Sequence, residues 1–381
     1  MSRRAVGPAE DERWMRRALA LAARGLGETN PNPVAGCVIV KDGQVVGEAY
    51  HARAGRPHAE VLAIARAGAR ARGATLFVTL EPCSHFGRTP PCAPLVRDSG
   101  VRRVVAAMRD PNPLVNGKGL AGLRRAGLAV RTGVLQEEAL LLNERFVVSV
   151  REGRPFVLLK AALTLDGRIA AASGHSRWIT SPAQRAQARW LRRLHDAVLI
   201  GIGTALADDP LLLPSPRTRR PFTRIVMDSR LRLPPASRLV RSTGPRTPVL
   251  VVTTSRDPLA RRRLEGAGVE VLPIRAERGR VSLGGALEAL GARGFRSVLV
   301  EGGSEMLGSF LAARLVDQVA LFRAPLLLGG RASRPSFGGK GPPTVTDALR
   351  LRPTSPLLRR GSAARFPWPR PRLFELWYPQ R

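Results

Sequence analysis

His58-Ala59-Glu60, followed by Pro82-Cys83 and then Pro90-Pro91-Cys92, is the stretch that decides the fold of the first part of this 381-residue chain. It offers one imidazole, two thiols and one carboxylate. A catalytic zinc ion takes three protein ligands and leaves a fourth position for solvent, whereas a structural zinc takes four protein ligands. We therefore expect His58, Cys83 and Cys92 to bind Zn²⁺, and Glu60 to remain free to move protons.

The residues around this motif predict where its members lie. Pro57 to Glu60 precede a segment with apolar residues at helical spacing, which places His58 and Glu60 in the first turn of a helix. Residues 75–79 predict a strand that leads to Cys83, and Cys92 opens a short helix that ends near residue 98. The third cysteine, Cys37, lies in an apolar run, and we expect it to be a buried strand residue.

The order H-x-E and then P-C is typical of zinc deaminases, in which the second cysteine usually follows two residues after the first. Here residues 84–91 separate Cys83 from Cys92, so the chain departs from the short-loop pattern. His85 and Arg88 lie in this long loop. They are candidates to contact a base or a phosphate, although ordinary loop residues would also account for them.

Length and composition limit the remaining possibilities. A chain of 381 residues is too long for one ordinary core, so we expect two domains. The zinc motif places the deaminase domain at 1–150, a polar linker follows at 151–155, and the second domain covers 156–381. No apolar run approaches the roughly 18 residues of a membrane helix, and no signal peptide is visible. Free thiols that serve a metal fit a reducing compartment, so we expect a cytoplasmic protein without a membrane partner.

The net charge of +33 raises the possibility of nucleic-acid binding. Only four of the 62 basic residues are lysine, and the arginines are scattered through every expected element. Aromatic residues make up 5% of the chain, which leaves few platforms for stacking bases. We therefore do not expect nucleic acid to be the primary partner, and we expect the charge to attract phosphorylated small molecules.

Strand and helix patterns alternate along the first half of the chain, which predicts an α/β layer with a mostly parallel sheet there. In the first half we expect helices at 11–24, 93–98, 117–126 and 134–146 and a further helix that starts at His58, and strands at 34–40, 45–50, 75–79, 103–107 and 128–131. In the second half we expect strands at 156–163, 197–202 and 297–300, and a final strand at 373–378. Residues 331–372 are rich in Arg, Pro, Gly and Ser, and we expect a variable, partly mobile loop there; a basic arm that binds nucleic acid is the alternative.

Pro31-Asn32-Pro33, His58 to Val61, Thr79 to His85 with Cys92, and Asp110 to Pro113 resemble the bifunctional riboflavin-biosynthesis deaminase/reductase family. The resemblance covers about residues 11–330. It implies a three-layer cytidine-deaminase-like domain followed by a dihydrofolate-reductase-like domain. It also implies deamination of 2,5-diamino-6-(5-phosphoribosylamino)pyrimidin-4-one, and then NADPH reduction of the ribosyl group to give 5-amino-6-(5-phosphoribitylamino)uracil.

The same resemblance implies site residues. Asn32 would contact the deaminase substrate, unless it serves only to form a turn. The residues that would contact NADPH are Ala162, Trp178, Thr204, Asp208, Gly303, Ser304, Glu305, Met306, Leu307, Gly308 and Ser309. Those that would contact the phosphoribosyl substrate are Ser176, Arg192, Leu212 and Glu301.

The residues themselves add to this assignment. Lys160 is a cation among apolar strand residues, so we expect it to bond Glu301 or a sugar hydroxyl; a purely structural ion pair is the alternative. No G-x-G-x-x-G motif opens a βαβ unit, so a Rossmann site is not supported. The glycines at 302–303 separate a buried strand from a helix, where backbone N–H groups can cradle a diphosphate. Trp178 as core packing, Asp208 as part of a loop and the glycines as a turn without ligand are the alternatives.

One departure from the family pattern concerns phosphate binding. After Asp208-Asp209-Pro210 the family usually reads Leu-Thr-Val-Arg, whereas this chain reads Leu212-Leu213-Pro214-Ser215-Pro216-Arg217. Either Arg217 replaces the displaced arginine or Arg192 binds the phosphate. Two other functions remain open at this point, namely a single-activity zinc deaminase acting on nucleic acid and a non-catalytic zinc-stabilised binding protein. Exposed sheet edges and the resemblance favour a homo-oligomer.

Overall fold

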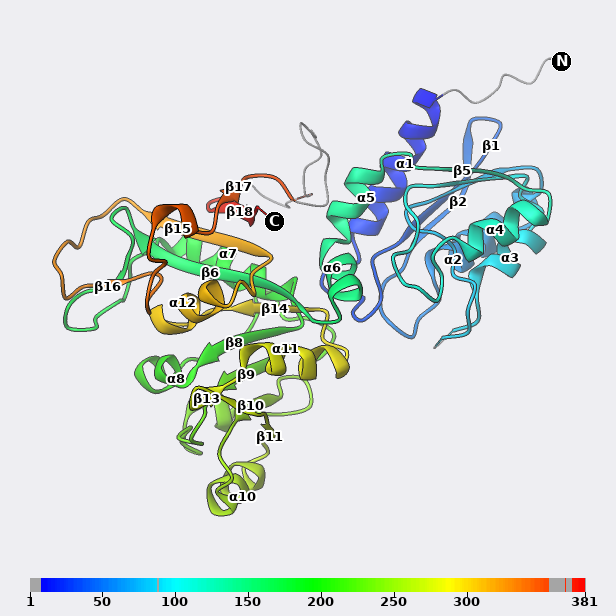
Figure 1. Cartoon of the computed structure of the whole chain (residues 1–381). Helices are drawn as coiled ribbons and strands as arrows, with labels where there is room; N and C mark the ends of the chain where they lie inside the picture. Colours follow the sequence, from blue (N-terminus) through cyan, green and yellow to red (C-terminus); the bar gives the residue numbers. More distant parts are fainter. Residues whose placement is uncertain (1–7, 88, 356–366, 368–371, 381) are drawn as a thin grey trace. The chain divides into compact units, whose positions relative to one another are not determined.

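The computed structural model describes residues 8–87, 89–355, 367 and 372–380. They form two compact units, unit 1 extending to Arg151 and unit 2 beginning at Glu152 (Figure 1). Within these ranges no helix has the length and apolar character needed to cross a membrane. Arg88 and parts of the segment 331–372, on which the sequence suggested a phosphate contact and a mobile loop, lie outside the described residues.

Unit 1 contains a five-stranded sheet in the order β2-β1-β3-β4-β5. Its strands are β1 (Gly36–Lys41), β2 (Gln44–Tyr50), β3 (Thr75–Val78), β4 (Arg103–Ala106) and β5 (Ala129–Thr132). The expectation of a mostly parallel sheet is wrong for unit 1, because β1 runs antiparallel to β2 and β3, while β3, β4 and β5 are parallel. Asp42 and Gly43 both have positive φ and close a two-residue hairpin between β1 and β2, which explains why this edge is antiparallel.

Helices cover both faces of this sheet and give three layers (Figure 1). They are α1 (Pro8–Ala23), α5 (Gln136–Leu142) and α6 (Glu144–Glu152) on one face, and α2 (Ala59–Ala67), α3 (Cys92–Asp98) and α4 (Lys118–Arg125) on the other. Alternate residues of β1 supply both cores, since Val38 packs with α1 whereas Cys37 and Ile39 pack with α2. Cys37 is fully buried, as expected.

The helix expected at 134–146 and the linker expected at 151–155 differ in kind from the structure, while the other predicted bounds in unit 1 lie within three residues of the observed ones. The single helix expected at 134–146 is divided into α5 and α6, because Asn143 has left the helical conformation and uses its side chain to pair with Val34. The helix α6 then continues to Glu152, so the polar stretch 151–155 begins inside a helix.

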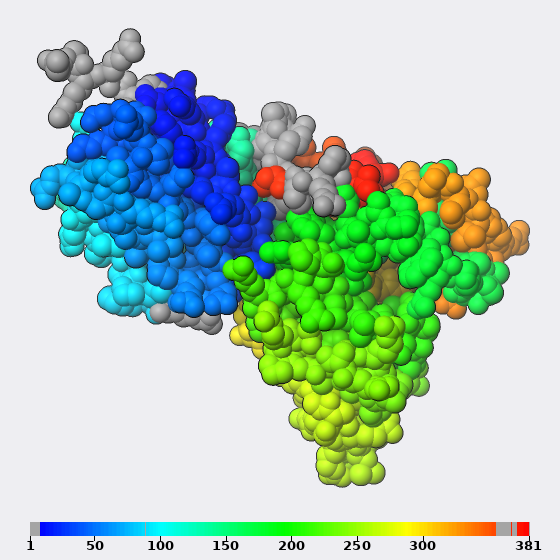
Figure 2. Space-filling view, turned by 180° about the vertical axis from the view of Figure 1, so that it is seen from behind, coloured from blue at the N-terminus to red at the C-terminus, as the bar shows by residue number. Residues whose placement is uncertain are grey.

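Unit 2 contains a nine-stranded sheet in the order β11-β10-β9-β8-β14-β6-β15-β18-β17. Its strands are β6 (Phe156–Thr164), β8 (Ala197–Gly201), β9 (Thr223–Met227), β10 (Val249–Thr253), β11 (Glu270–Pro273), β14 (Ser297–Val300), β15 (Gln318–Ala324), β17 (Leu351–Arg352) and β18 (Glu375–Pro379). The strands from β11 to β15 are parallel, and β18 adds antiparallel to β15, which confirms the final strand expected near the end of the chain. The yellow-green residues around the β11 edge form a tapering end of this unit (Figure 2).

The helices of unit 2 are α7 (Pro182–Arg193), α8 (Ile202–Asp208), α9 (Arg238–Arg241), α10 (Pro258–Gly266), α11 (Leu283–Ala292) and α12 (Ser304–Ala312). One core lies between the sheet and α11 and α12, and a second contains buried residues of α8, α9 and α10. Two short pairs lie outside the main sheet: β7 (Arg168–Ala170) with β16 (Arg334–Pro335), and β12 (Ala276–Glu277) with β13 (Arg280–Val281). The remaining helical turns are η1 (Gly68–Ala71) and η2 (Val345–Asp347).

Candidate active sites

The three side chains predicted to bind zinc lie together in unit 1. His58 precedes α2, Cys83 follows β3, and Cys92 is the first residue of α3. Their ligand atoms all lie within 4.8 Å of one another, with Nδ1 of His58 3.6 Å from the Cys83 sulfur and 3.3 Å from the Cys92 sulfur. Tetrahedral zinc, with Zn–S near 2.3 Å and Zn–N near 2.0 Å, separates such atoms by roughly 3.5 Å. The cluster therefore fits a zinc ion with three protein ligands.

Neighbouring groups fix the orientation of the histidine ring and the protonation of the two cysteines for metal binding. Nε2 of His58 lies 3.4 Å from the Thr89 hydroxyl, so Nδ1 is the nitrogen that faces the sulfurs. The backbone N–H of Cys92 donates to the Cys83 sulfur over 3.3 Å. A hydrogen bond from the Cys92 thiol, supported by His58, lowers the pKa of Cys83 to about 4 although burial opposes it. The pKa of Cys92 is raised by its bond to that thiolate and by burial, and zinc removes such a proton on binding.

Glu60 lies beside the cluster on the first turn of α2 and is 4% exposed. Burial raises the pKa of its carboxyl to about 7, although the nearby His58 opposes this rise. A carboxyl with such a pKa holds and releases a proton near neutrality, which is what a general acid and base requires.

A second histidine lies next to the cluster, and sequence reasoning assigned it no role. The His51 ring meets the His58 ring edge-on, with centroids 5.0 Å apart. Nδ1 of His51 donates to the carbonyl of Pro57 over 3.2 Å, which leaves Nε2 to accept a hydrogen bond from the Asn32 amide at 3.1 Å. The predicted substrate residue Asn32 is thus held at the metal cluster by His51. The only signal in the sequence was the rarity of histidine, which occurs five times.

Glu81 lies in the sequence motif of residues 79–85, and the sequence alone suggested no role for it. Its carboxylate is 2% exposed and accepts hydrogen bonds from the backbone N–H groups of Asp110, Gly117, Gly119 and Leu120, at 2.8–3.3 Å. It therefore caps α4 and fixes the chain immediately before Cys83. Close packing supports the same arrangement, because a Cβ on Gly119 would lie 2.1 Å from the carbonyl oxygen of Pro82.

In unit 2 the predicted site residues gather where parallel strands end. The strands β8, β14 and β6 are neighbours in the sheet, and their carboxyl ends lead to Thr204, Glu301 and Ala162. Ligands of open α/β sheets bind at this edge.

A group of ion pairs, whose side chains are 10–16% exposed, occupies that edge. Arg192 binds both carboxylate oxygens of Glu301, at 2.7 and 3.0 Å, and Lys160 lies 3.6 Å from the same carboxylate. The predicted contact between Lys160 and Glu301 is thus confirmed. Burial would raise the pKa of Glu301, but the charges of Arg192 and Lys160 lower it to about 2. Burial lowers the pKa of Lys160, and Glu301 opposes that shift.

The glycine turn before α12 is held by one of the predicted residues. The backbone N–H of Gly303 donates to the Thr204 hydroxyl over 3.0 Å. Gly303, Ser304, Met306 and Ser309 are partly exposed and Glu305 is exposed, whereas Leu307 and Gly308 are buried. The first turn of α12 can therefore meet a ligand directly, while the next two residues face the interior.

The other predicted residues lie on the loops at this edge. Trp178 is 68% exposed, with the Arg185 guanidinium 4.3 Å from its ring centroid. Asp208 ends α8 and its carbonyl accepts a hydrogen bond from Arg177 at 2.8 Å. Ser176 is half-buried, Leu212 is buried and Ala162 pairs with Phe322 across β6 and β15.

The loop that departs from the family pattern lies next to Arg192. The Leu213 carbonyl accepts a hydrogen bond from Arg192 over 3.0 Å. Leu213 and Arg217 line a pocket of about 260 Å³ whose walls also include Arg246 and Phe222. The lining contains two arginines and no acidic residue, so it suits an anion.

Comparisons with known proteins agree with the two expected domains. Residues 8–108 match the cytidine and deoxycytidylate deaminase zinc-binding region, and residues 155–357 match the RibD C-terminal domain. The riboflavin biosynthesis protein RibD of Aquifex aeolicus is 42% identical over 344 residues, which are 90% of this chain and 94% of that protein. The chain belongs to the RibD family.

Solved structures of the family agree over nearly the whole chain. RibD of Acinetobacter baumannii is 36% identical with a TM-score of 0.84, covering 98% of this chain and 100% of that one. A Thermotoga maritima protein described as a diaminohydroxyphosphoribosylaminopyrimidine deaminase/5-amino-6-(5-phosphoribosylamino)uracil reductase is 35% identical with a TM-score of 0.80, covering 98% and 99%. The chain is therefore a bifunctional deaminase and reductase of riboflavin biosynthesis. A single-activity deaminase acting on nucleic acid is not supported. The zinc-binding region supports Zn²⁺ as the metal, and the reductase domain fits a nicotinamide cofactor.

Proposed function

We propose that unit 1 deaminates 2,5-diamino-6-(5-phosphoribosylamino)pyrimidin-4-one and that unit 2 reduces the ribosyl group of the product with NADPH. The observation that carries the first assignment is the convergence of His58, Cys83 and Cys92 beside the buried carboxyl of Glu60. The second assignment rests on the ion-pair group of Lys160, Arg192 and Glu301 next to the Gly303 turn.

In the deaminase, His58, Cys83 and Cys92 hold the zinc. When bound, zinc lowers the pKa of a water ligand toward 7 and so supplies the nucleophile at neutral pH. Glu60 delivers a proton to a ring nitrogen of the pyrimidine and then moves a proton to the departing ammonia. Asn32, held by His51, orients the base. Burial of Glu60 keeps its proton from exchanging freely with solvent.

In the reductase, free backbone N–H groups in the first turn of α12 bind the cofactor diphosphate, while the Gly303 N–H is held by the Thr204 hydroxyl. Ala162, Trp178, Thr204, Asp208, Glu305, Met306 and Ser309 complete the NADPH site, whereas the predicted Leu307 and Gly308 are buried and support it from the interior. Lys160, Ser176, Arg192, Leu212 and Glu301 bind the phosphoribosyl substrate. Glu301 neutralises one of its two cationic partners, so the group keeps a net positive charge that favours a phosphate.

The pocket lined by Leu213 and Arg217 concerns the question of which arginine replaces the displaced phosphate-binding arginine. We infer that Arg217 takes over the phosphate contact, because Leu213 joins this pocket to Arg192. We also infer a cytoplasmic homo-oligomer whose partners are phosphorylated small molecules rather than nucleic acid or membrane.

Two assays on the purified chain test the proposal. Ammonia release from the diaminopyrimidine, and none from cytidine or tRNA, is the result expected for unit 1. Glu60→Gln should retain zinc while its ammonia release falls by about 10²–10⁴-fold. NADPH oxidation should require the deaminated product and continue in Glu60→Gln when that product is supplied. Normal deamination by Glu60→Gln, or NADPH consumption that ignores the pyrimidine, would contradict the respective assignment.

A further inference from the structure

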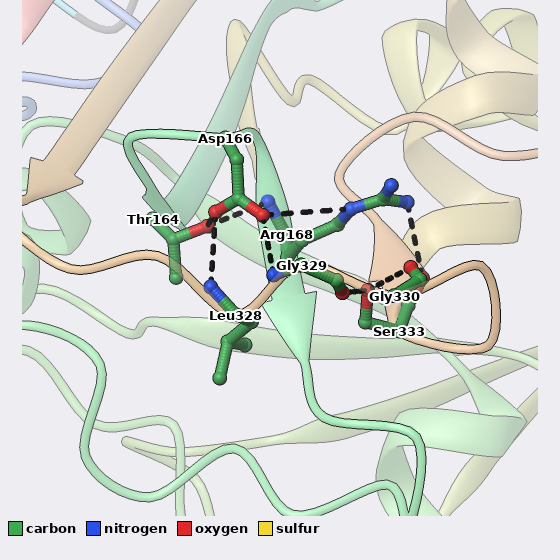
Figure 3. A network of polar contacts seen from close by, with 7 residues as sticks. All are labelled: Thr164, Asp166, Arg168, Leu328, Gly329, Gly330 and Ser333. Carbon is green, nitrogen blue, oxygen red and sulfur yellow. Dashed lines mark hydrogen bonds and ion pairs between the residues drawn. The ribbon is translucent and has the colours of Figure 1, made fainter.

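A strap of residues 326–338 leaves the sheet of unit 2 after β15 and ends on α12. Its first residues are held by the turn that joins β6 to β7 (Figure 3). The Asp166 carboxylate accepts hydrogen bonds from the backbone N–H groups of Leu328, at 3.2 Å, and Gly329, at 2.8 Å. The backbone N–H of Leu165 donates to the Leu326 carbonyl over 2.9 Å.

The middle of the strap folds back onto the same turn. The Ser333 hydroxyl donates to the Gly330 carbonyl over 2.7 Å, and the Arg168 guanidinium donates to the Ser333 carbonyl over 3.1 Å (Figure 3). Arg334 then pairs with Ala170 in the short ladder between β16 and β7. Asp166 and the residues after it thus hold the strap over more than half of its length.

The far end of the strap rests on the first turns of α12. The backbone N–H of Gly338 donates to the Ser304 carbonyl over 2.9 Å. The two segments touch so closely that a Cβ on Gly308 would lie 1.9 Å from the Gly338 carbonyl oxygen. A Cβ on Gly338 would lie 2.5 Å from the Ser304 hydroxyl oxygen. A shift of the strap therefore requires a shift of the turn that begins α12.

We propose that Asp166 is a positioning residue of the reductase, which fixes the start of α12 for the nicotinamide cofactor by anchoring the strap 326–338. The inference rests on the proposed cofactor site at Gly303 to Ser309. The bonds of Asp166 are to neighbouring residues of its own turn and to the strap. Asp166 therefore affects the position of α12 through the strap. Hydrogen bonds from the Thr164 hydroxyl and from Gly329 lower the pKa of Asp166 to about 2, which keeps the anchor ionised at working pH.

Asp166→Asn tests the anchor with little change in volume. One carboxylate oxygen becomes an NH₂ group, which cannot accept from a backbone N–H. We expect the KM and Kd for NADPH to rise about tenfold, with kcat at saturating NADPH within about twofold of the parent value. The deaminase activity of the same chain should not change. Loss of fold alone would lower kcat and would not raise KM selectively.

Gly338→Ala tests the contact between the far end of the strap and α12. Its added methyl group meets Ser304, so it should also raise the KM for NADPH. Gly341→Ala is the matched control, because a Cβ there meets nothing within 4 Å and its φ needs no glycine. In the double variant Asp166→Asn/Gly338→Ala the increase in KM should be smaller than the product of the single increases.

Hydrogen exchange of the strap separates the outcomes. Faster exchange at 328–338 in Asp166→Asn, together with an unchanged KM for NADPH, would overturn the inference, as would a fall in kcat without a rise in KM. Failure of the unmodified chain to bind or oxidise NADPH would instead overturn the proposed function of unit 2. The parent protein is therefore measured first.

Discussion

The clearest quantitative expectation concerns Glu301, the carboxylate shared by Lys160 and Arg192. The change Glu301→Gln keeps the size of the side chain and removes its charge. Two cations, whose side chains are only 14–16% exposed, then lie side by side without their common partner. Removing one member of a buried ion pair typically costs about 3–5 kcal/mol, because the remaining charge stays desolvated.

The pKa of Glu301 gives a separate measure of the same effect. Its folded value of about 2 lies below the ordinary value of 4.5, and a shift of that size corresponds to about 3 kcal/mol. A depressed pKa contributes stability that is present above the unfolded pKa and is lost as the pH falls through the folded one. The stabilisation is thus complete at pH 7 and disappears between about pH 5 and pH 2. Glu301→Gln should show no such component.

Native-state hydrogen exchange in urea is the suitable assay, because the chain has two units and a single free energy of unfolding is not defined for it. Amides of β14 and β6 in Glu301→Gln should lose about 3 kcal/mol of protection at pH 7. Glu265→Gln, which removes an exposed pair with Arg261, is the control and should change protection by less than about 0.5 kcal/mol. Equal effects of the two variants, or a difference that does not shrink below pH 5, would refute the reasoning.

Three further outcomes follow from the structure. Cys83→Ser should lose stoichiometric zinc by metal analysis, whereas Cys37→Ser should keep it, because Cys37 is buried on β1 and is not one of the three clustered ligands; equal metal content in both variants would contradict the assigned ligands. In Glu81→Gln the amides of α4 should lose about 2 kcal/mol of protection from hydrogen exchange, since an amide side chain cannot accept all four backbone N–H bonds. The variant should also retain zinc less well. Unchanged protection of α4 would refute the capping role. Arg217→Ala should raise the KM of the reductase for its phosphorylated substrate about tenfold. Arg262→Ala, on the exposed face of α10, is the control and should leave this KM unchanged. An unchanged KM in both variants would assign the phosphate contact to Arg192 instead.

The parts of the sites that sequence could predict are those whose chemistry is local. His58 and Glu60 share one helical turn, and each cysteine stands at the junction of a loop with a regular element, so residue type and spacing identified the ligand set that the structure assembles. The pairing of Lys160 with Glu301 was also accessible, because a cation within an apolar strand requires a partner. The mixed direction of the first sheet was less accessible, since hydrophobic patterns do not state which strands are neighbours.

What sequence could not predict depends on contacts between distant segments. His51 acquires its place from Asn32 and Pro57, and Glu81 from the turn before α4. Asp166 binds the backbone of Leu328 and Gly329, which lie 162 and 163 residues further along the chain. Each of these three side chains contacts backbone groups or another site residue, and neither its type nor its place in the sequence indicates that role, even for Glu81 inside the motif. Residues that position a site therefore emerge from the fold, whereas residues that perform its chemistry are limited to a few types and remain visible in the sequence.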